Sequence, residues 1–106
     1  METKVTSEEL QIEILELKKA ALLFRAVNNK LRDQILHLLH KNQKLAVTSI
    51  YHTLSIEQSV ASQHLAILRK ANLVSTMRDG RSIYYSINYK KLDELHEYAD
   101  RLLQYS

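Results

Sequence analysis

The 106-residue chain contains no cysteine and no proline, and Gly80 is its single glycine. The absence of cysteine excludes disulfides, thiolate metal sites and cysteine redox switches, and so few helix-breaking residues favour long helices with short connections. The formal net charge is +3. A chain of this length is expected to form one domain, over residues 1–106, with one modest core.

The charge is unevenly distributed along the chain. Residues 1–17 contain five acidic residues and one lysine, a net of −4, so residues 18–106 carry +7. Within residues 58–91 there are six basic residues and one acid, Asp79, a net of +5. A local basic field attracts a polyanion such as nucleic acid, although a solvated basic surface is the alternative.

The first predicted helix covers Ser7–Val27, with Ser7 as its N-cap and two glutamates in the first turn, where the helix dipole favours negative charge. Apolar residues follow the helical period on one face: Leu10, Ile14, Leu17, Ala21 and Phe24. Further apolar residues fall on other faces: Ile12, Leu15, Leu22 and Ala26. One stripe is enough to dock a helix on its own domain, so the excess predicts that a second subunit covers the other side.

Asn28 and Asn29 interrupt this pattern and are expected to cap a second helix that ends near His40. Its inward residues are predicted to be Leu31, Ile35, Leu38 and Leu39. A polar turn over residues 41–44 and a short strand or extended link over residues 45–47 follow. Thr48 is then expected to cap a short helix that ends at Leu54.

The next stretch predicts a second helix after a short turn. Residues 55–58, with the sequence Ser-Ile-Glu-Gln, match the capping-box pattern and predict a helix that reaches about Ala71. Its buried face would hold Ala61, Leu65 and Leu68, and its other face Gln58, Ser59, Ser62, Gln63, Ala66 and Arg69. Two helices joined by a turn of about three residues form a helix-turn-helix, predicted over residues 48–71.

After Asn72 the apolar period changes from 3.6 to 2. Residues 73–78 and 81–87 are rich in β-branched and aromatic side chains, and Asp79-Gly80 between them is the preferred two-residue turn of a tight hairpin. This hairpin, residues 73–87, would form a wing. A last helix is expected from about Asn88 to Gln104, with a stripe at Leu92, Leu95, Ala99 and Leu102.

The terminal helix has more apolar surface than its own domain can cover. We therefore expect residues 7–27 and 89–104 to be dimerisation helices of a homodimer. The alternative is a terminal helix that packs only on its own subunit. The whole element order predicts a mainly α fold with a small β-hairpin, a winged helix-turn-helix.

Features that DNA binding requires are present in this element order. Short polar side chains on a helix suit base edges in the major groove, and Gln58, Ser59, Ser62 and Gln63 are of this kind. Arg69 and Lys70, nearer the end of the helix, are better placed for phosphate, and Arg78 and Arg81 flank the hairpin turn for contact with the backbone or the minor groove. A solvated polar helix face with ordinary turn-flanking charges is the alternative.

Residues 55–87 resemble the ArsR/SmtB family of bacterial transcriptional repressors. The resemblance lies in Gln58-Ser59-Val60-Ala61-Ser62-Gln63-His64-Leu65, in Leu68-Arg69-Lys70-Ala71-Asn72-Leu73-Val74 and in the hairpin Arg78-Asp79-Gly80-Arg81-Ser82-Ile83-Tyr84-Tyr85. The family usually has glycine at the position of Asn72, and asparagine tolerates the same left-handed conformation.

This resemblance implies a homodimer formed by the first and last helices. It also implies two recognition helices in successive major grooves of a near-palindromic operator, with Ser59, Ser62, Gln63 and His64 facing the DNA. For His64, holding the turn or a phosphate is an equal alternative.

Many members of the family sense metals through ligands at two known places in the fold. The family's thiolate site would fall in residues 47–50, where no cysteine is present. A second family site uses Asp and His of the last helix, where Asp93 and His96 are three residues apart, but the histidine cluster expected near the end of that helix is absent. We therefore expect no metal and no cofactor. The trigger of such a regulator stays open between a small ligand between the subunits, a protein partner and no effector.

Taken together, the sequence predicts a regulator that binds double-stranded DNA at specific sequences, a repressor. No signal peptide and no apolar run long enough to cross a bilayer is visible, so a cytoplasmic protein without membrane attachment is expected. An enzyme is not expected, since no phosphate loop, nucleophile elbow or acid–base constellation is present. The alternative is a winged-helix module that binds protein or RNA, which should be more apolar on the recognition face and less basic at the wing.

Overall fold

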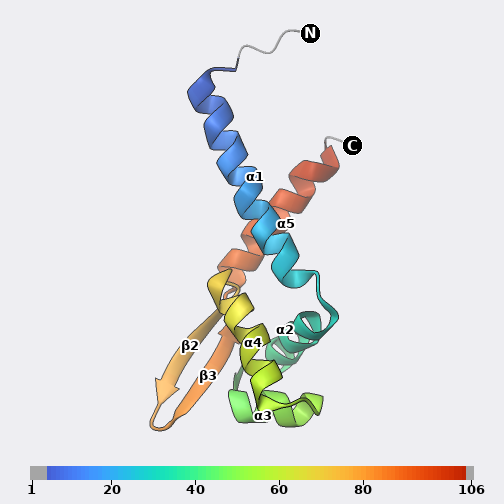
Figure 1. The fold of residues 1–106 in the computed structure, drawn as a ribbon, viewed down its shortest axis with the longest axis vertical. Helices are drawn as coiled ribbons and strands as arrows, with labels where there is room; N and C mark the ends of the chain where they lie inside the picture. Colours follow the sequence, from blue (N-terminus) through green and yellow to red (C-terminus); the bar gives the residue numbers. More distant parts are fainter. Residues whose placement is uncertain (1–4, 105–106) are drawn as a thin grey trace.

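The computed structural model describes residues 5–104, and the side chains of residues 5–101. Its elements are α1 (Ser7–Val27), α2 (Lys30–Asn42), β1 (Lys44–Ala46), α3 (Val47–Leu54), α4 (Gln58–Lys70), β2 (Val74–Asp79), β3 (Ser82–Ile87) and α5 (Tyr89–Gln104). Figure 1 shows α1 and α5 crossing as two long arms that leave the body, while the β2–β3 hairpin projects at the opposite end. The predicted winged helix-turn-helix is confirmed. Within the described residues, no helix is long and apolar enough to cross a membrane.

The hydrophobic core lies where α2, α3 and α4 meet the sheet. Its largest fully buried side chains are Ile35, Leu39, Ile50, Leu65, Leu68 and Leu73. Each such side chain stabilises the fold by about 1.5–3 kcal/mol relative to an exposed position. Because the core draws on α2, α3, α4 and the segment before β2, it fixes the relative orientation of the helix-turn-helix and the hairpin.

The sheet has three strands in the order β1-β3-β2, all antiparallel. β1, expected as a short strand or a link, pairs with β3 through Leu45 and Tyr85. The predicted hairpin turn is wrong by one residue: Asp79 pairs with Ser82, so the turn residues are Gly80 and Arg81. Gly80 has φ +63°, and glycine at the first turn position supplies the positive φ that a right-twisted hairpin requires.

Three predicted helix caps are also wrong. The N-cap of α1 is Thr6 and not Ser7: its hydroxyl accepts from the Glu9 N–H at 3.1 Å, and the Glu9 carboxylate accepts from the Thr6 N–H at 3.3 Å. α3 begins at Val47, with Ala46 as its cap, so Thr48 lies inside the helix. Neighbouring hydroxyl residues carry the same local signal, and backbone geometry selects among them.

Ser55 ends α3 and does not begin α4. Its φ is +55°, in the left-handed region, and its N–H donates to the His52 carbonyl at 3.2 Å. α4 then starts at Gln58 with Glu57 as its N-cap and no side-chain cap. The predicted capping box is therefore wrong, because the chain must reverse direction between two packed helices and a left-handed residue makes that turn.

The inward faces of α1 and α2 differ from the predicted stripes. In α1 the buried residues are Ala20, Leu23 and Ala26, because only the last turns of this helix reach the body. In α2 the buried residues are Arg32, Ile35, Leu36 and Leu39, so an arginine occupies the inward stripe. Asn29 caps α2 as expected, accepting from the N–H groups of Leu31 and Arg32 at 3.0 Å each.

Candidate nucleic-acid interface

The recognition helix α4 has one buried and one polar face, as the sequence predicts. Ala61, Leu65 and Leu68 are fully buried against α2 and the core. The exposed side chains of α4 are Gln58, Ser59, Ser62, Gln63, Ala66, Ile67, Arg69 and Lys70, so Ile67 faces outward although its apolar character suits the buried side. Because small and amide side chains line this face, its backbone can approach another surface closely while it presents hydrogen-bond donors and acceptors.

A left-handed residue ends α4. Asn72, with φ +61°, follows the C-cap residue of the helix. The N–H of Leu73 donates to the Leu68 carbonyl at 3.0 Å and the N–H of Asn72 to the Arg69 carbonyl at 2.9 Å. This is the Schellman pattern of helix ends, and it confirms that asparagine serves here in place of glycine.

The wing, formed by β2 and β3, adds positive charge beside the recognition helix. Arg78, on β2, and Arg81, in the turn, are both exposed. Figure 1 shows the turn at the tip of a narrow hairpin that extends away from the body. On the neighbouring strand β1, the Lys44 ammonium lies 5.3 Å from the centre of the ring of Tyr84 on β3. The two arginines are therefore free to contact a surface that α4 also approaches.

His64 occupies a different position from the other predicted site residues. Its ring is half-buried, and Nδ1 lies 3.1 Å from the Arg32 Nη1, so the ring faces α2. Burial first, and the positive charge of Arg32 second, lower the pKa of His64 below its ordinary 6.5. Arg32 was missed in the sequence, although its spacing to Ile35, Leu36 and Leu39 follows the inward helical period.

Comparison with known proteins identifies the family. Residues 29–76 match the model of the arsR family of bacterial regulatory proteins. The chain is 36% identical over 84 residues to the transcriptional activator HlyU of Vibrio cholerae, covering 79% of this chain and 77% of that one. It is 36% identical over 83 residues to the transcriptional repressor PagR of Bacillus anthracis, covering 78% and 83%. The chain belongs to the ArsR family.

A solved structure supports the same assignment. The crystal structure of NolR from Sinorhizobium fredii superimposes on this ArsR-family chain with a TM-score of 0.70 at 33% identity, covering 93% of this chain and 95% of that one. The predicted family is thus confirmed, and with it a DNA-binding transcription regulator of the winged helix-turn-helix type. The roles of individual side chains toward DNA stay predictions.

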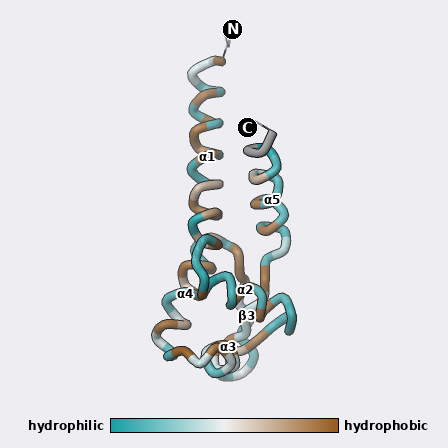
Figure 2. The backbone as a smooth tube through the Cα atoms, turned by 90° about the vertical axis from the view of Figure 1, so that its right-hand side faces the viewer, coloured by the Kyte–Doolittle hydropathy of each residue, from teal (hydrophilic) through white to brown (hydrophobic). Residues whose placement is uncertain are grey.

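The arms of this ArsR-family regulator, helices α1 and α5, carry apolar side chains beyond the core. Figure 2 shows hydrophobic positions recurring along the whole length of α1, including the part above the body. Its exposed large apolar residues are Leu10, Ile12, Leu15, Leu17 and Leu22, the last with 59% of its surface accessible. The arms contact each other through Arg101 Nη1 and Glu16 Oε2, 3.4 Å apart. An apolar surface of this extent on a helix is typical of an interaction face.

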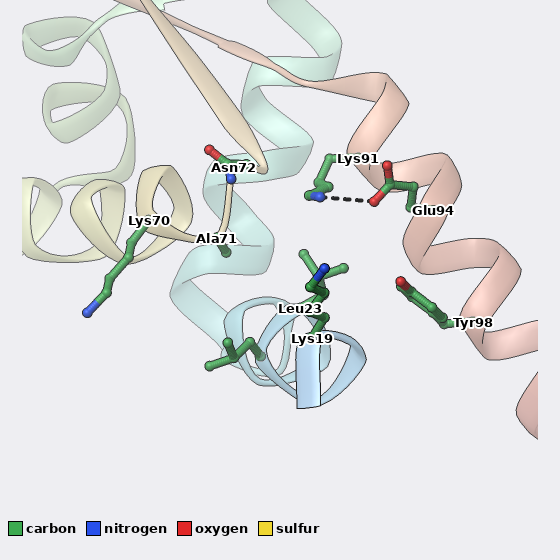
Figure 3. Close-up of a pocket in the computed structure, with 9 residues that line it drawn as sticks. Lys19, Leu23, Lys70, Ala71, Asn72, Lys91, Glu94 and Tyr98 are labelled. Carbon is green, nitrogen blue, oxygen red and sulfur yellow. Dashed lines mark hydrogen bonds and ion pairs between the residues drawn. The ribbon is translucent and has the colours of Figure 1, made fainter. Parts of the chain in front are cut away.

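A cavity of about 390 Å³ lies between the arms and the end of the recognition helix, lined by Lys19, Leu22, Leu23, Lys70, Ala71, Asn72, Lys91, Glu94 and Tyr98. Figure 3 shows Lys70 directed away from this space, whereas Lys91 and Glu94 form an ion pair at its wall, 2.9 Å apart. The cavity therefore combines apolar side chains with a charge pair that is already formed.

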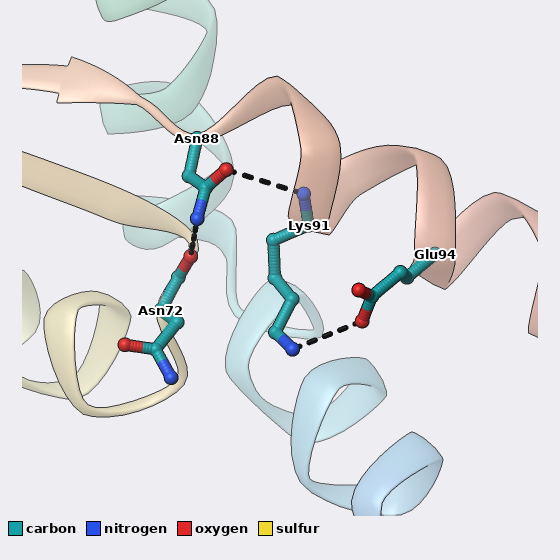
Figure 4. Close-up of polar contacts among 4 residues, drawn as sticks. All are labelled: Asn72, Asn88, Lys91 and Glu94. Atoms are coloured by element: carbon teal, nitrogen blue, oxygen red, sulfur yellow. Dashed lines mark hydrogen bonds and ion pairs between the residues drawn. The ribbon is translucent and has the colours of Figure 1, made fainter.

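Asn88 connects this end of α4 to α5. Its amide Nδ2 donates to the Asn72 carbonyl at 2.9 Å, and its Oδ1 accepts from the Lys91 N–H at 3.3 Å (Figure 4). One side chain thus satisfies a first-turn N–H of α5 and a carbonyl of the turn after α4. The end of the recognition helix is held against one arm.

The histidines and acids of α5 do not gather around a common point. His96 pairs with Asp100 at 3.6 Å, both exposed, and Asp93 is exposed. Across the described part of the chain, no group of three or more His, Cys, Asp or Glu side chains lies close enough together to hold a metal ion.

Proposed function

We propose that the chain acts as a homodimer that places two α4 helices in successive major grooves of a near-palindromic operator and represses the adjacent gene. One observation carries this proposal: the exposed face of α4 is mostly polar, with Ile67 as the one large apolar side chain among its exposed residues, and the neighbouring wing exposes Arg78 and Arg81. A module for docking protein would have an apolar face there.

In this proposal the side chains divide by chemistry. Gln58, Ser59, Ser62 and Gln63 contact base edges, since glutamine can bond bidentately to adenine and serine to bases or phosphate. Arg69 and Lys70 contact phosphate, and Arg78 and Arg81 contact the backbone or an adjacent minor groove. His64 already bonds Arg32 through Nδ1, so only its Nε2–H is left for a phosphate.

The test is an electrophoretic mobility shift with the DNA upstream of the chain's own gene, repeated over a salt series. We expect nanomolar-range binding that weakens steeply as salt rises, because phosphate contacts release counterions. Binding that does not depend on salt would instead favour the protein-docking alternative, and preference for single-stranded RNA would favour RNA binding.

Two substitutions separate base contacts from phosphate contacts. Gln63→Ala should lower affinity for the upstream duplex and leave affinity for unrelated duplex DNA unchanged, whereas Arg81→Ala should weaken both and reduce the salt slope by about 1. Lys18→Ala, on α1, removes the same charge away from the interface and serves as control. Identical effects of Gln63→Ala and Arg81→Ala would contradict this division.

The direction of regulation needs a separate measurement. The relative from Bacillus anthracis is named a repressor and that from Vibrio cholerae an activator. We expect repression, so deletion of the gene should raise transcription from the promoter that the protein binds. A fall in transcription would assign it as an activator and leave the DNA-binding proposal intact.

A further inference from the structure

Arg32 occupies a junction between three helices. It belongs to α2, only 9% of its surface is accessible, and the hydrogen bonds of its side chain lead to the end of α1 and to α4. Nε donates to the Ala26 carbonyl at 2.6 Å, Nη2 to the Arg25 carbonyl at 3.2 Å and Nη1 to Nδ1 of His64 on α4 at 3.1 Å. One planar guanidinium therefore contacts α1 and the recognition helix at the same time.

The end of α1 shows why an arginine is needed there. The last four carbonyls of a helix lack partners within it. Here the Asn28 N–H donates to Phe24, the Asn29 N–H donates to Val27, and Arg32 satisfies the two between them, Arg25 and Ala26. The positive charge also suits the negative end of the helix dipole. Among the described side chains, no carboxylate forms an ion pair with Arg32.

The contact with Arg32 also determines which ring nitrogen of His64 carries the proton. Arginine is always protonated and has donors only, so Nδ1 of His64 must be the acceptor and its proton must sit on Nε2. The ring is then neutral and fixed in one tautomer. This contact joins residues 32 positions apart in the chain and lies on the recognition helix, one residue after Gln63.

We infer that Arg32 is a positioning residue for DNA recognition, which through His64 holds the recognition helix at a set orientation to α1. In a dimer built on α1 and α5, that orientation decides whether the two α4 helices reach successive grooves in register. The consequence for DNA rests on the proposed function, whereas the contact itself does not.

A direct test measures the orientation without DNA. The chain has no cysteine, so Lys18→Cys on α1 and Ala66→Cys on α4, both at exposed positions, accept spin labels, and dilution with unlabelled chain leaves only distances within one chain. We expect a narrow distance distribution in the parent. It should broaden in His64→Phe, which removes the acceptor, and in Arg32→Lys, whose single nitrogen cannot span the three acceptors that three guanidinium nitrogens of arginine reach.

Rescue and control variants separate positioning from loss of folding. His64→Asn places an amide oxygen where Nδ1 lies and should restore the narrow distribution. Arg25→Lys changes an exposed arginine next to the junction and should leave it narrow. If neither His64→Phe nor Arg32→Lys changed the distance distribution, the inference would be overturned. A distance distribution in His64→Asn as broad as that in His64→Phe would also overturn it.

A binding measurement tests the consequence for DNA. The ratio of affinities for the upstream and an unrelated duplex does not depend on the fraction of folded protein. We expect this ratio to fall about tenfold in His64→Phe and Arg32→Lys, the size of losing one base contact, and to be kept in His64→Asn. A parent without preference for the upstream duplex would contradict the proposed operator, and the spin-label result would still decide the inference. If every variant kept the parental ratio of the two affinities, Arg32 would not position the recognition helix for DNA binding.

Discussion

Several residues of this chain have backbone conformations that their residue types alone do not predict. Three non-glycine residues, Gln43, Ser55 and Asn72, have positive φ, and each ends a helix or begins a turn. Gly80 is the fourth left-handed position, at the wing turn. Non-glycine residues tolerate this region at a cost, so these four positions are where the backbone is least free to accept substitution.

Gly80→Ala should destabilise the protein by about 1 kcal/mol. A methyl group there would meet no atom within 4 Å, so the whole effect comes from the φ of +63° and not from a clash. Urea denaturation measures the loss. Gly80→Asn should lose less, because asparagine tolerates the left-handed region, and Arg81→Ala, whose φ is not positive, should lose almost nothing. An alanine variant as stable as the parent would contradict the turn geometry.

His64 should make stability depend on pH. Burial and then Arg32, the charged group that α2 directs at the ring, lower its pKa in the folded state below 6.5, while α1 faces this junction with the Arg25 and Ala26 carbonyls that Arg32 holds. The unfolded chain therefore binds the proton first as the pH falls. The contribution of neutral His64 to the free energy of unfolding is therefore complete above pH 6.5. It is lost as the pH drops toward the pKa that His64 has in the folded state.

Chemical denaturation at pH 7.5 and pH 5.5 checks this dependence. His64→Asn cannot titrate, so its free energy of unfolding should differ less between the two pH values than that of the parent. His52→Asn replaces an exposed histidine on α3 and should keep the parental difference. An equal pH dependence in the parent and His64→Asn would mean that other groups cause it.

Among the elements, the recognition helix combines structural and functional demands on opposite faces. Leu65 is fully buried, whereas Ile67, two residues on, is 43% exposed. The inward face fixes α4 in the core, and the outward face is left for DNA in the proposed function. Substitutions on the two faces of this helix should therefore differ in how much unfolding free energy they cost.

Leu65→Ala should cost about 2–5 kcal/mol of unfolding free energy, through lost burial and the cavity left behind. Ile67→Ala removes a side chain of the same size from the partly exposed side and should cost less than about 1 kcal/mol. Thermal and urea unfolding of both variants make the comparison. Similar losses in the two would place the buried face of α4 elsewhere.

For the whole molecule, the long apolar arm is the feature that the single chain does not explain. α1 extends beyond the body, and Leu10, Leu15 and Leu22 stay exposed although α5 lies against the helix. Large apolar side chains exposed together along one helix are typical of an interaction face. A second copy of the chain is the cover that we propose.

A dimer should melt at a higher temperature as the protein concentration rises, because association stabilises the folded state by mass action. Leu15→Glu should lower the melting temperature and remove its concentration dependence, and sedimentation should show a monomer. Gln34→Glu, on α2, adds the same charge at an exposed position and should change neither. A parent that sediments as a monomer at all concentrations would refute the dimer.

Several predictions from the sequence were confirmed because they depend on local chemistry. The bounds of α1, the three buried residues of α4, the polar face opposite them and the use of Asn72 at a helix end all follow from period and backbone preference. Where two adjacent residues had the same chemistry, as with Thr6 and Ser7 at the start of α1, local reasoning chose the wrong one.

The sequence by itself therefore determined the order of elements, the wing and the surface that faces DNA in the proposal, since helical period, turn chemistry and charge are properties of neighbouring residues. Only the tertiary structure decided that Ser55 ends α3, that the inward stripe of α2 begins with an arginine, and that this arginine meets His64. These outcomes depend on how helices are rotated against one another, and the free energy that sets this rotation comes from contacts between residues far apart in the chain.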